Sequence, residues 1–264
     1  MYKRQVFRGT DDTLTGWKEN FNMSFMETVP SQIQAADYLS KAAASFKGRF
    51  VVAGHSKGGN LSVYACAAVD EILTNRITQI YNFDGPGFLP HMLEKEGYKK
   101  IAHKICKIVP QDSIIGMLLE QKEDYQVVKS RKEGYLQHDC FMWQIKKDKL
   151  VRTDKISAKS ANLDKTLSKL MNEMPIEARK DIINTFFNIL YETGAHTLSQ
   201  LSENKLDIAM KTISAIRHMD EKSVAVMKHA VGLFIKESQS NKKIIKRETK
   251  RRRLRKKTGY SQTD

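Results

Sequence analysis

The chain has 264 residues, of which 41% are hydrophobic and 8% aromatic, and its formal net charge is +15. This length and composition are those of a globular protein that buries a sizeable core in one large domain or two modest ones. No run approaches about 18 consecutive apolar residues, so we expect no transmembrane helix. Cys66, Cys106 and Cys140 lack metal-type spacing, and we expect buried thiols in a reducing compartment, with no metal or other cofactor.

Most of the positive charge belongs to one segment near the end of the chain. Residues 242–257 contain eleven Lys and Arg against the single acid Glu248, and therefore carry ten of the fifteen net charges. Such blocks are usually solvated, so residues 241–264 are interpreted as a basic disordered tail. We expect this run to contact an anionic membrane or another polyanion. The rest of the chain is only mildly basic, which disfavours specific nucleic-acid binding as the main function.

Residues 1–5 are interpreted as a cloning or sequencing artefact. A globular α/β domain rarely begins inside a strand, yet Val6 and Phe7 already have strand character. The codons ATG TAT AAG AGA CAG encode these five residues and match the end of a sequencing-transposon adaptor. The alternative is a genuine short N-terminus. On the first interpretation, native strands and any targeting signal are missing upstream, and the cytoplasmic location that we expect rests on the residues present.

Strand-like and helix-like segments alternate over residues 6–152, which predicts a mostly parallel sheet with helices on its faces. The expected strands are residues 6–8, 49–53, 77–83, 104–109, 126–129 and 141–146. The expected helices are residues 31–46, 57–71 and 88–96. The run before Gly54 is continuously apolar, which is typical of a central strand covered on both faces.

After about residue 153 the strand signals vanish, and residues 153–240 are predicted to form a helical C-terminal region. Apolar residues recur there at helical spacing in three stripes, of which the first is Ile183, Phe186, Phe187 and Leu190, and the others begin at Leu206 and Val224. Pro175 suits a first helical turn and Gly194 a helix end. We interpret these stripes as packing faces rather than cofactor sites.

The most informative stretch is Gly54-His55-Ser56-Lys57-Gly58, which lies between the predicted strand at 49–53 and the predicted helix at 57–71. G-x-S-x-G in this context is typical of a nucleophile elbow, a turn so tight that side chains two positions from the serine would collide with backbone. The glycines remove those side chains and leave the Ser56 hydroxyl raised above the sheet. The alternative is a plain glycine-rich turn.

A serine nucleophile needs a base, and the base needs an orienting acid. On this type of sheet the chain order is Ser, then Asp or Glu, then His, each after a later strand. Asp112 follows the predicted strand at 104–109, and His138 lies in a later loop, so they are the predicted acid and base. Asp84, which follows the next strand after the elbow, is a weaker candidate for the acid.

Other histidines and acids compete for these roles less well. His91 and His103 precede Asp112 in the chain, and His55 is held beside the serine. Asp139 points away from its neighbour His138 if the segment is extended.

An oxyanion hole needs two N–H donors. Lys57, directly after the nucleophile, should provide one of them at the start of the helix. The second should come from a loop after an early strand, where Gly9 allows close backbone approach and Thr10 is placed to donate.

The motifs FRGT, GHSKGG, DGPGF and QHDCFMW together resemble the class 3 lipases, and most closely a bacterial lipase-like α/β-hydrolase family of largely unknown function. In that family FRGTDDTLxGWKEDFNMSF is followed by GHSKGGNLAVYAA, DGPGF and QHDxxxW. The match covers about residues 6–145 and implies an N-terminally truncated α/β-hydrolase-like core. The roles that the resemblance implies are Ser56 as nucleophile, Asp112 as acid, His138 as base, and Thr10 and Lys57 as oxyanion donors.

These observations predict a serine hydrolase that cleaves the ester of an acyl lipid or a small acyl ester through an acyl-enzyme. Esters are favoured over amides only by the resemblance. One alternative is a non-catalytic binding or scaffolding protein that keeps the elbow and uses its helical region for partners. Another is a polyanion or acidic-membrane binder driven by residues 242–257.

Overall fold

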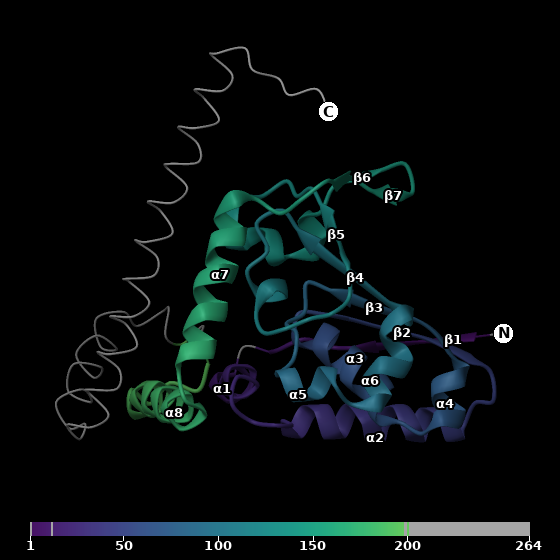
Figure 1. Ribbon diagram of the computed structural model, residues 1–264, viewed down its shortest axis with the longest axis horizontal. Helices are drawn as coiled ribbons and strands as arrows, with labels where there is room; N and C mark the ends of the chain where they lie inside the picture. Colours follow the sequence, from purple (N-terminus) through teal and green to yellow (C-terminus); the bar gives the residue numbers. More distant parts are fainter. Residues whose placement is uncertain (1, 12, 198–199, 201–264) are drawn as a thin grey trace, which may run out of the picture.

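The computed structural model describes residues 2–11, 13–197 and 200. Within them lies a sheet in the order β1-β2-β3-β4-β5-β8 (Figure 1). The strands are β1 (Tyr2–Phe7), β2 (Arg49–His55), β3 (Ile77–Phe83), β4 (Ile105–Pro110), β5 (Tyr125–Val128) and β8 (Arg152–Thr153). Neighbouring strands from β1 to β5 run parallel, and β8 pairs antiparallel with β5 at one edge. The predicted mostly parallel α/β sheet is therefore confirmed.

Helices cover the sheet and also follow it in the chain. They are α1 (Leu14–Asn22), α2 (Pro30–Ala44), α3 (Lys57–Ala68), α4 (Glu71–Arg76), α5 (Pro90–Leu93), α6 (Glu96–Ile101), α7 (Ala158–Glu173) and α8 (Ile176–Glu192). Short 3₁₀ turns are η1 (Ala102–Lys104), η2 (Ile115–Met117), η3 (Gly134–His138) and η4 (Cys140–Met142). A small hairpin, β6 (Ile145–Lys146) and β7 (Lys149–Leu150), projects from the sheet (Figure 1).

The main core lies between the sheet and the layer formed by α2, α3 and α6 (Figure 1). Leu39 of α2, Val52 of β2 and Ile80 of β3 are fully buried in it. Along β2, buried residues alternate with partly exposed ones, so its second face is less covered than its apolar sequence predicts. A smaller cluster joins Trp143 to Ile108 of β4 and Val128 of β5.

Several predicted boundaries differ from the observed ones because local caps decide where a helix stops. The predicted helix 57–71 ends at Ala68, since the Asp70 carboxylate accepts the N–H of Leu73 and starts α4. Helix α1 was not predicted, although Thr13 caps it in the same way. The predicted strand 141–146 is wrong over its first half, which forms the turn η4. There the buried Trp143 donates its indole N–H to the carbonyl of Gln137.

Predictions were also made for the first five residues and for the C-terminal part of the chain. Residues 2–5, which were interpreted as part of an artefact, extend β1 and pair in parallel with β2. This pairing uses backbone groups, so the interpretation of residues 1–5 as an artefact stays a prediction. The apolar stripes that begin at Leu206 and Val224, and the basic tail 241–264, lie outside the described residues.

The helical region after residue 153 is confirmed as far as it is described. Pro175 is the N-cap of α8 rather than a residue of its first turn, and Gly194 follows the helix with a φ of +76°. From the predicted stripe, Phe187 is buried and meets Phe21 of α1 edge to face. The end of this region also joins α1 through a hydrogen bond from the N–H of Leu14 to the carbonyl of His196.

Among the described residues, no helix combines the length and apolar character needed to cross a bilayer. The same part of the chain contains no group of three His, Cys, Asp or Glu side chains placed to hold a metal ion.

One charged side chain lies in the interior of the sheet. Lys107 of β4 is fully buried, stands beside Asn82 of β3, and donates a hydrogen bond to the amide oxygen of Gln121. Burial lowers the pKa of Lys107 to about 8, although the charges of Glu123, Asp84 and Asp164 act in the opposite direction. The folded protein therefore holds this proton less tightly than the unfolded chain does.

This lower pKa in the folded protein predicts that Lys107 makes the free energy of unfolding rise with pH. Between about pH 8 and 10.5 the unfolded lysine binds a proton that the folded one has lost, so the free energy of unfolding increases, by about 3 kcal/mol in all. Urea unfolding across this range should show the increase in the wild type and its loss in Lys107→Met. The exposed Lys47→Met is the control and should keep it. An identical pH dependence in wild type and Lys107→Met would contradict the prediction.

Candidate active site

Ser56 occupies the corner between β2 and α3 in a strained backbone conformation. Its φ of 57° and ψ of −131° lie in a region that side-chain-bearing residues rarely adopt. A Cβ on Gly54 would collide with the carbonyl of Gly58, and one on Gly58 would collide with the carbonyl of Phe7. The Ser56 N–H donates to the carbonyl of Phe83 at 2.9 Å, which ties the corner to β3. The predicted tight corner between strand and helix is confirmed, and the role of Ser56 as nucleophile stays a prediction.

His138 ends η3 and faces a carboxylate that is fully buried. Its Nδ1 lies 2.7 Å from Oδ2 of Asp84, and the His138 side chain is 28% exposed. Because the carboxylate can only accept, Nδ1 carries the proton and Nε2 is the nitrogen left free to act as a base.

Asp84 follows β3 directly, and hydrogen bonds hold both its backbone and its side chain. Its backbone has a φ of 49°, and its N–H donates to the carbonyl of Ile108 at 2.8 Å. The Ser113 hydroxyl donates to Oδ1 at 2.5 Å, so both carboxylate oxygens have a partner. A Cβ on Gly116 would collide with Oδ1, which means that only glycine leaves room for the carboxylate.

Asp112 does not meet His138, and the predicted contact between them is wrong. Its Oδ2 accepts the N–H of Gly134 at 2.8 Å and the side-chain amide of Gln137 at 2.9 Å. The Gln137 oxygen in turn accepts the N–H of Asp112. Asp112 therefore braces the turn that carries His138. The short turn after β4 aims Asp112 at this backbone, whereas its neighbour Ser113 reaches the buried carboxylate.

The sequence contains a signal for Asp84, although Asp84 was predicted to be a weaker candidate for the acid than Asp112. DGPGF begins directly after β3, which neighbours the β2 strand of the elbow. The loop packs against the elbow itself, because a Cβ on Gly85 would lie 2.6 Å from the carbonyl oxygen of Ser56.

His55 supports the backbone of the candidate base, a role that was not predicted from the sequence. Its Nε2 lies 2.6 Å from the backbone carbonyl of His138, and the two ring centroids are 4.6 Å apart. Burial and the neighbouring His138 lower the pKa of His55, so it is neutral and donates its Nε2 proton to that carbonyl. The residue before Ser56 thus holds the backbone of the candidate base. Within the described residues no hydrogen bond joins the Ser56 hydroxyl to His138, a contact that often tightens only when substrate binds.

The loop after β1 lies against the elbow, as the predicted oxyanion hole requires. A Cβ on Gly9 would lie 3.0 Å from the carbonyl oxygen of His55 and 3.5 Å from the Cβ of Ser56. Thr10 and Lys57, the predicted donors, line one open pocket of about 260 Å³. Their role as oxyanion donors stays a prediction.

Two successive residues of α1 hold these two positions. The Asn20 side-chain amide donates to the Thr10 hydroxyl at 2.7 Å, and Glu19 pairs with the Lys57 ammonium, which is almost fully buried. Burial alone would raise the pKa of Glu19, but hydrogen bonds from Lys57 and from the N–H of Ser31 outweigh it and lower the pKa. Glu19 is therefore ionised at neutral pH.

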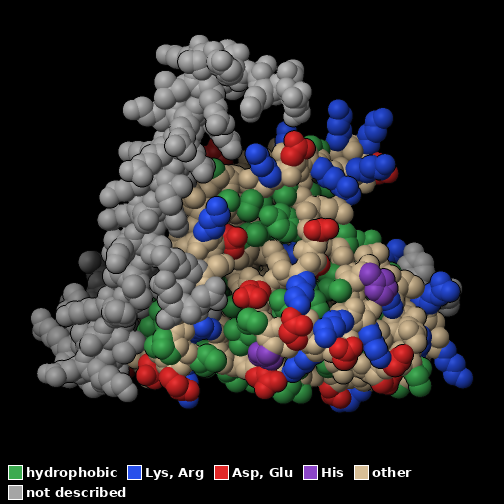
Figure 2. All heavy atoms as spheres, in the orientation of Figure 1, with side chains coloured by type: hydrophobic (Ala, Val, Ile, Leu, Met, Phe, Trp, Pro, Cys, Tyr) green, Lys and Arg blue, Asp and Glu red, His purple; other side chains and the backbone are tan. Residues whose placement is uncertain are grey.

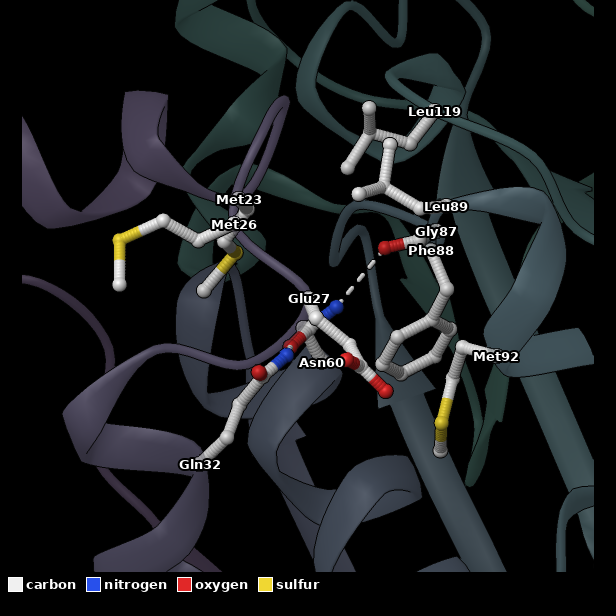
Figure 3. A pocket seen from close by; sticks show the side chains of 10 residues that line it. All are labelled: Met23, Met26, Glu27, Gln32, Asn60, Gly87, Phe88, Leu89, Met92 and Leu119. Carbon is white, nitrogen blue, oxygen red and sulfur yellow. Dashed lines mark hydrogen bonds between the residues drawn. The ribbon is translucent and has the colours of Figure 1, made fainter. Parts of the chain in front are cut away.

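The loop that carries Asp84 is pinned to α3 from its other side. The buried Asn60 amide donates to the carbonyl of Gly87 at 2.8 Å and accepts from the amide of Gln32 at 2.8 Å (Figure 3). Figure 3 shows Met23 and Met26 on one side of the adjoining cleft and Phe88 and Met92 on the other. The cleft has a volume of about 10 Å³, roughly that of one water, so we place no ligand there.

The sequence model of the Mbeg1-like family matches residues 2–188, more than half of the chain. The chain belongs to the Mbeg1-like family. This family is lipase-like, which agrees with the resemblance found in the sequence, while the relation to class 3 lipases stays a prediction. The Mbeg1-like match includes the elbow, Asp84 and His138. No curated protein matches the chain.

The Glu19–Lys57 pair predicts a stability difference between two acidic residues. Glu19→Gln leaves the buried Lys57 ammonium without its counter-charge and should lower the free energy of unfolding by about 3 kcal/mol. Glu27→Gln is the matched control, because Glu27 pairs with Lys95 at the exposed surface and should show no measurable change. Urea unfolding measures both. Equal effects of the two substitutions would show that Lys57 does not depend on Glu19.

Proposed function

We propose that the protein is a serine hydrolase of carboxylic esters, with Ser56 as nucleophile, His138 as general base and Asp84 as the orienting acid. One observation carries the proposal: the fully buried Asp84 carboxylate lies 2.7 Å from Nδ1 of His138, beside a serine strained at a strand-to-helix corner. Asp84 replaces Asp112 in this role. The lipase-like family supports a hydrolase.

Asp84 determines which tautomer His138 adopts. With its Nδ1 proton donated to the carboxylate, the imidazole presents a free Nε2 to the serine hydroxyl. Nε2 takes the hydroxyl proton as Ser56 Oγ bonds to the ester carbonyl carbon. The resulting imidazolium is stabilised by the buried carboxylate, whose second oxygen is already occupied by the Ser113 hydroxyl.

The carbonyl oxygen becomes an oxyanion in this step. The N–H of Lys57, at the first turn of α3, and the N–H of Thr10 are the proposed donors. His138 then gives its proton to the leaving alcohol, and the carbon–oxygen bond of the ester breaks. Water repeats the sequence on the acyl-enzyme and releases the acid. The pocket of about 260 Å³ beside these donors suits a small acyl or alcohol group.

The nucleophile can be tested with a fluorophosphonate probe. A serine with a base and an oxyanion hole reacts with such a probe, because the adduct is tetrahedral like the natural intermediate. We expect labelling of the full chain at Ser56 by mass spectrometry, with loss of labelling in Ser56→Ala. Ser24→Ala is the control and should label like the wild type. A folded chain that neither labels nor hydrolyses short activated esters would favour the scaffolding alternative.

The acid can be assigned by comparing two aspartates. Asp84→Asn should lower the acylation rate by about ten-thousand-fold, since an amide at this position favours the wrong imidazole tautomer. Asp112→Asn removes only a brace of η3 and should lower the rate by about tenfold at most, the equivalent of one hydrogen bond. Stopped-flow kinetics with an activated ester, on variants with unchanged circular dichroism, measures both rates. The reverse order of effects would return the role to Asp112.

A further inference from the structure

Large apolar side chains are exposed around the turn that carries the candidate base. Phe141 is 86% exposed, Ile145 63% and Leu136 48%. Leu136 precedes and Phe141 follows His138 in the chain, so these two flank the candidate base, and Ile145 begins β6 four residues after Phe141. Exposed apolar side chains are normal singly, but a group of them marks a contact surface.

Basic residues are frequent in the segment that contains these three residues. Residues 129–155 contain eight Lys and Arg against four Asp and Glu. Backbone hydrogen bonds place the segments side by side: the N–H of Arg131 donates to the carbonyl of Met142, and that of Gln144 to Lys129, both at 2.8 Å. Figure 2 shows the Lys and Arg side chains gathered at the β6–β7 hairpin.

These basic residues also lack the carboxylate partners that several exposed lysines have elsewhere. Lys41, Lys95, Lys99, Lys100 and Lys122 each pair with a carboxylate, whereas the exposed Lys47 pairs with none among the described residues. Within the described part of the chain, none of the eight basic residues between 129 and 155 forms an ion pair. Their charges are therefore available to an anionic partner.

We propose that this face, made of Leu136, Phe141, Ile145 and the basic residues of the β6–β7 hairpin, docks on an anionic phospholipid surface. Apolar side chains surrounded by unpaired cations match the boundary between acyl chains and anionic headgroups. A soluble polyanion would use the charges alone and would gain nothing from an exposed phenylalanine. The face is made of other residues than the basic run 242–257.

Docking of this kind would bring the rim of the candidate site to the lipid. His138 lies between Leu136 and Phe141, so a headgroup ester at the surface would be near the base. The docking proposal itself does not depend on catalysis, because binding to vesicles is measured without turnover.

A tryptophan at position 141 reports directly on the face. In the full chain, Phe141→Trp should show a blue shift on vesicles of phosphatidylcholine with phosphatidylglycerol, and quenching when the lipids carry brominated acyl chains. Ile72→Trp, at another exposed apolar position on α4, should show neither. Because the chain also contains Trp17 and Trp143, each variant is read as a difference from the wild type.

Affinity for the same vesicles separates the contributions of the face. Phe141→Ser should weaken binding roughly tenfold, and Lys146→Gln with Lys149→Gln roughly fivefold for each charge. Ile72→Ser should bind like the wild type. The exposure of these positions keeps the fold of every variant intact.

Two results would overturn the proposal. The chain could bind the vesicles without any change at Phe141→Trp, which would assign binding to the run 242–257. Alternatively, heparin could bind with the same dependence on Lys146 and Lys149 while Phe141→Ser has no effect on vesicles, which would identify a soluble polyanion as the partner.

Discussion

The close contact between glycines at the end of β2 and the start of α3 is the constraint on which the rest of the site depends. Gly54 packs on the carbonyl of Gly58, and Gly58 packs on the carbonyl of Phe7, so β1, β2 and α3 approach more closely than side chains would allow. This approach forces Ser56 into its strained conformation and brings the loop after β1 against the elbow. The same contact therefore positions the candidate nucleophile and the predicted oxyanion donors.

Buried polar groups hold the remaining parts of the site by a similar logic. Asp84 is fully buried with both oxygens bonded, and Asp112 is partly exposed and bonded to the backbone of η3. A buried carboxylate without partners would be costly, so the hydrogen bonds to Asp84 also determine its position. Asp84 thus faces the imidazole of His138, and Asp112 supports the turn η3 that carries His138.

The charge of the described residues is unevenly distributed over the surface. Ion pairs balance the lysines around α2, α5 and α6, whereas the hairpin beyond the site carries cations without carboxylate partners. An overall charge of +15 conceals this difference, because most of it belongs to residues 242–257. The segment 129–155 is the second basic region, and its apolar side chains distinguish it from the first.

The sequence by itself determined the elbow, the parallel α/β sheet and the helical region that follows. Each rests on local information: glycines two positions from Ser56, apolar strands bounded by helices, and apolar residues at helical spacing. Even β3 was predicted with its observed ends, Ile77 and Phe83.

Only the tertiary structure decided which aspartate meets His138 and what holds the base in place. Asp84 and Asp112 both follow parallel strands and both lie between Ser56 and His138 in the chain, so chain order does not choose between them. The choice depends on the direction of each side chain after its strand and on whether Ser113 and Gly116 leave a buried space for a carboxylate. Such directions arise from contacts between residues distant in sequence, here 54 positions apart for Asp84 and His138. No local pattern encodes them.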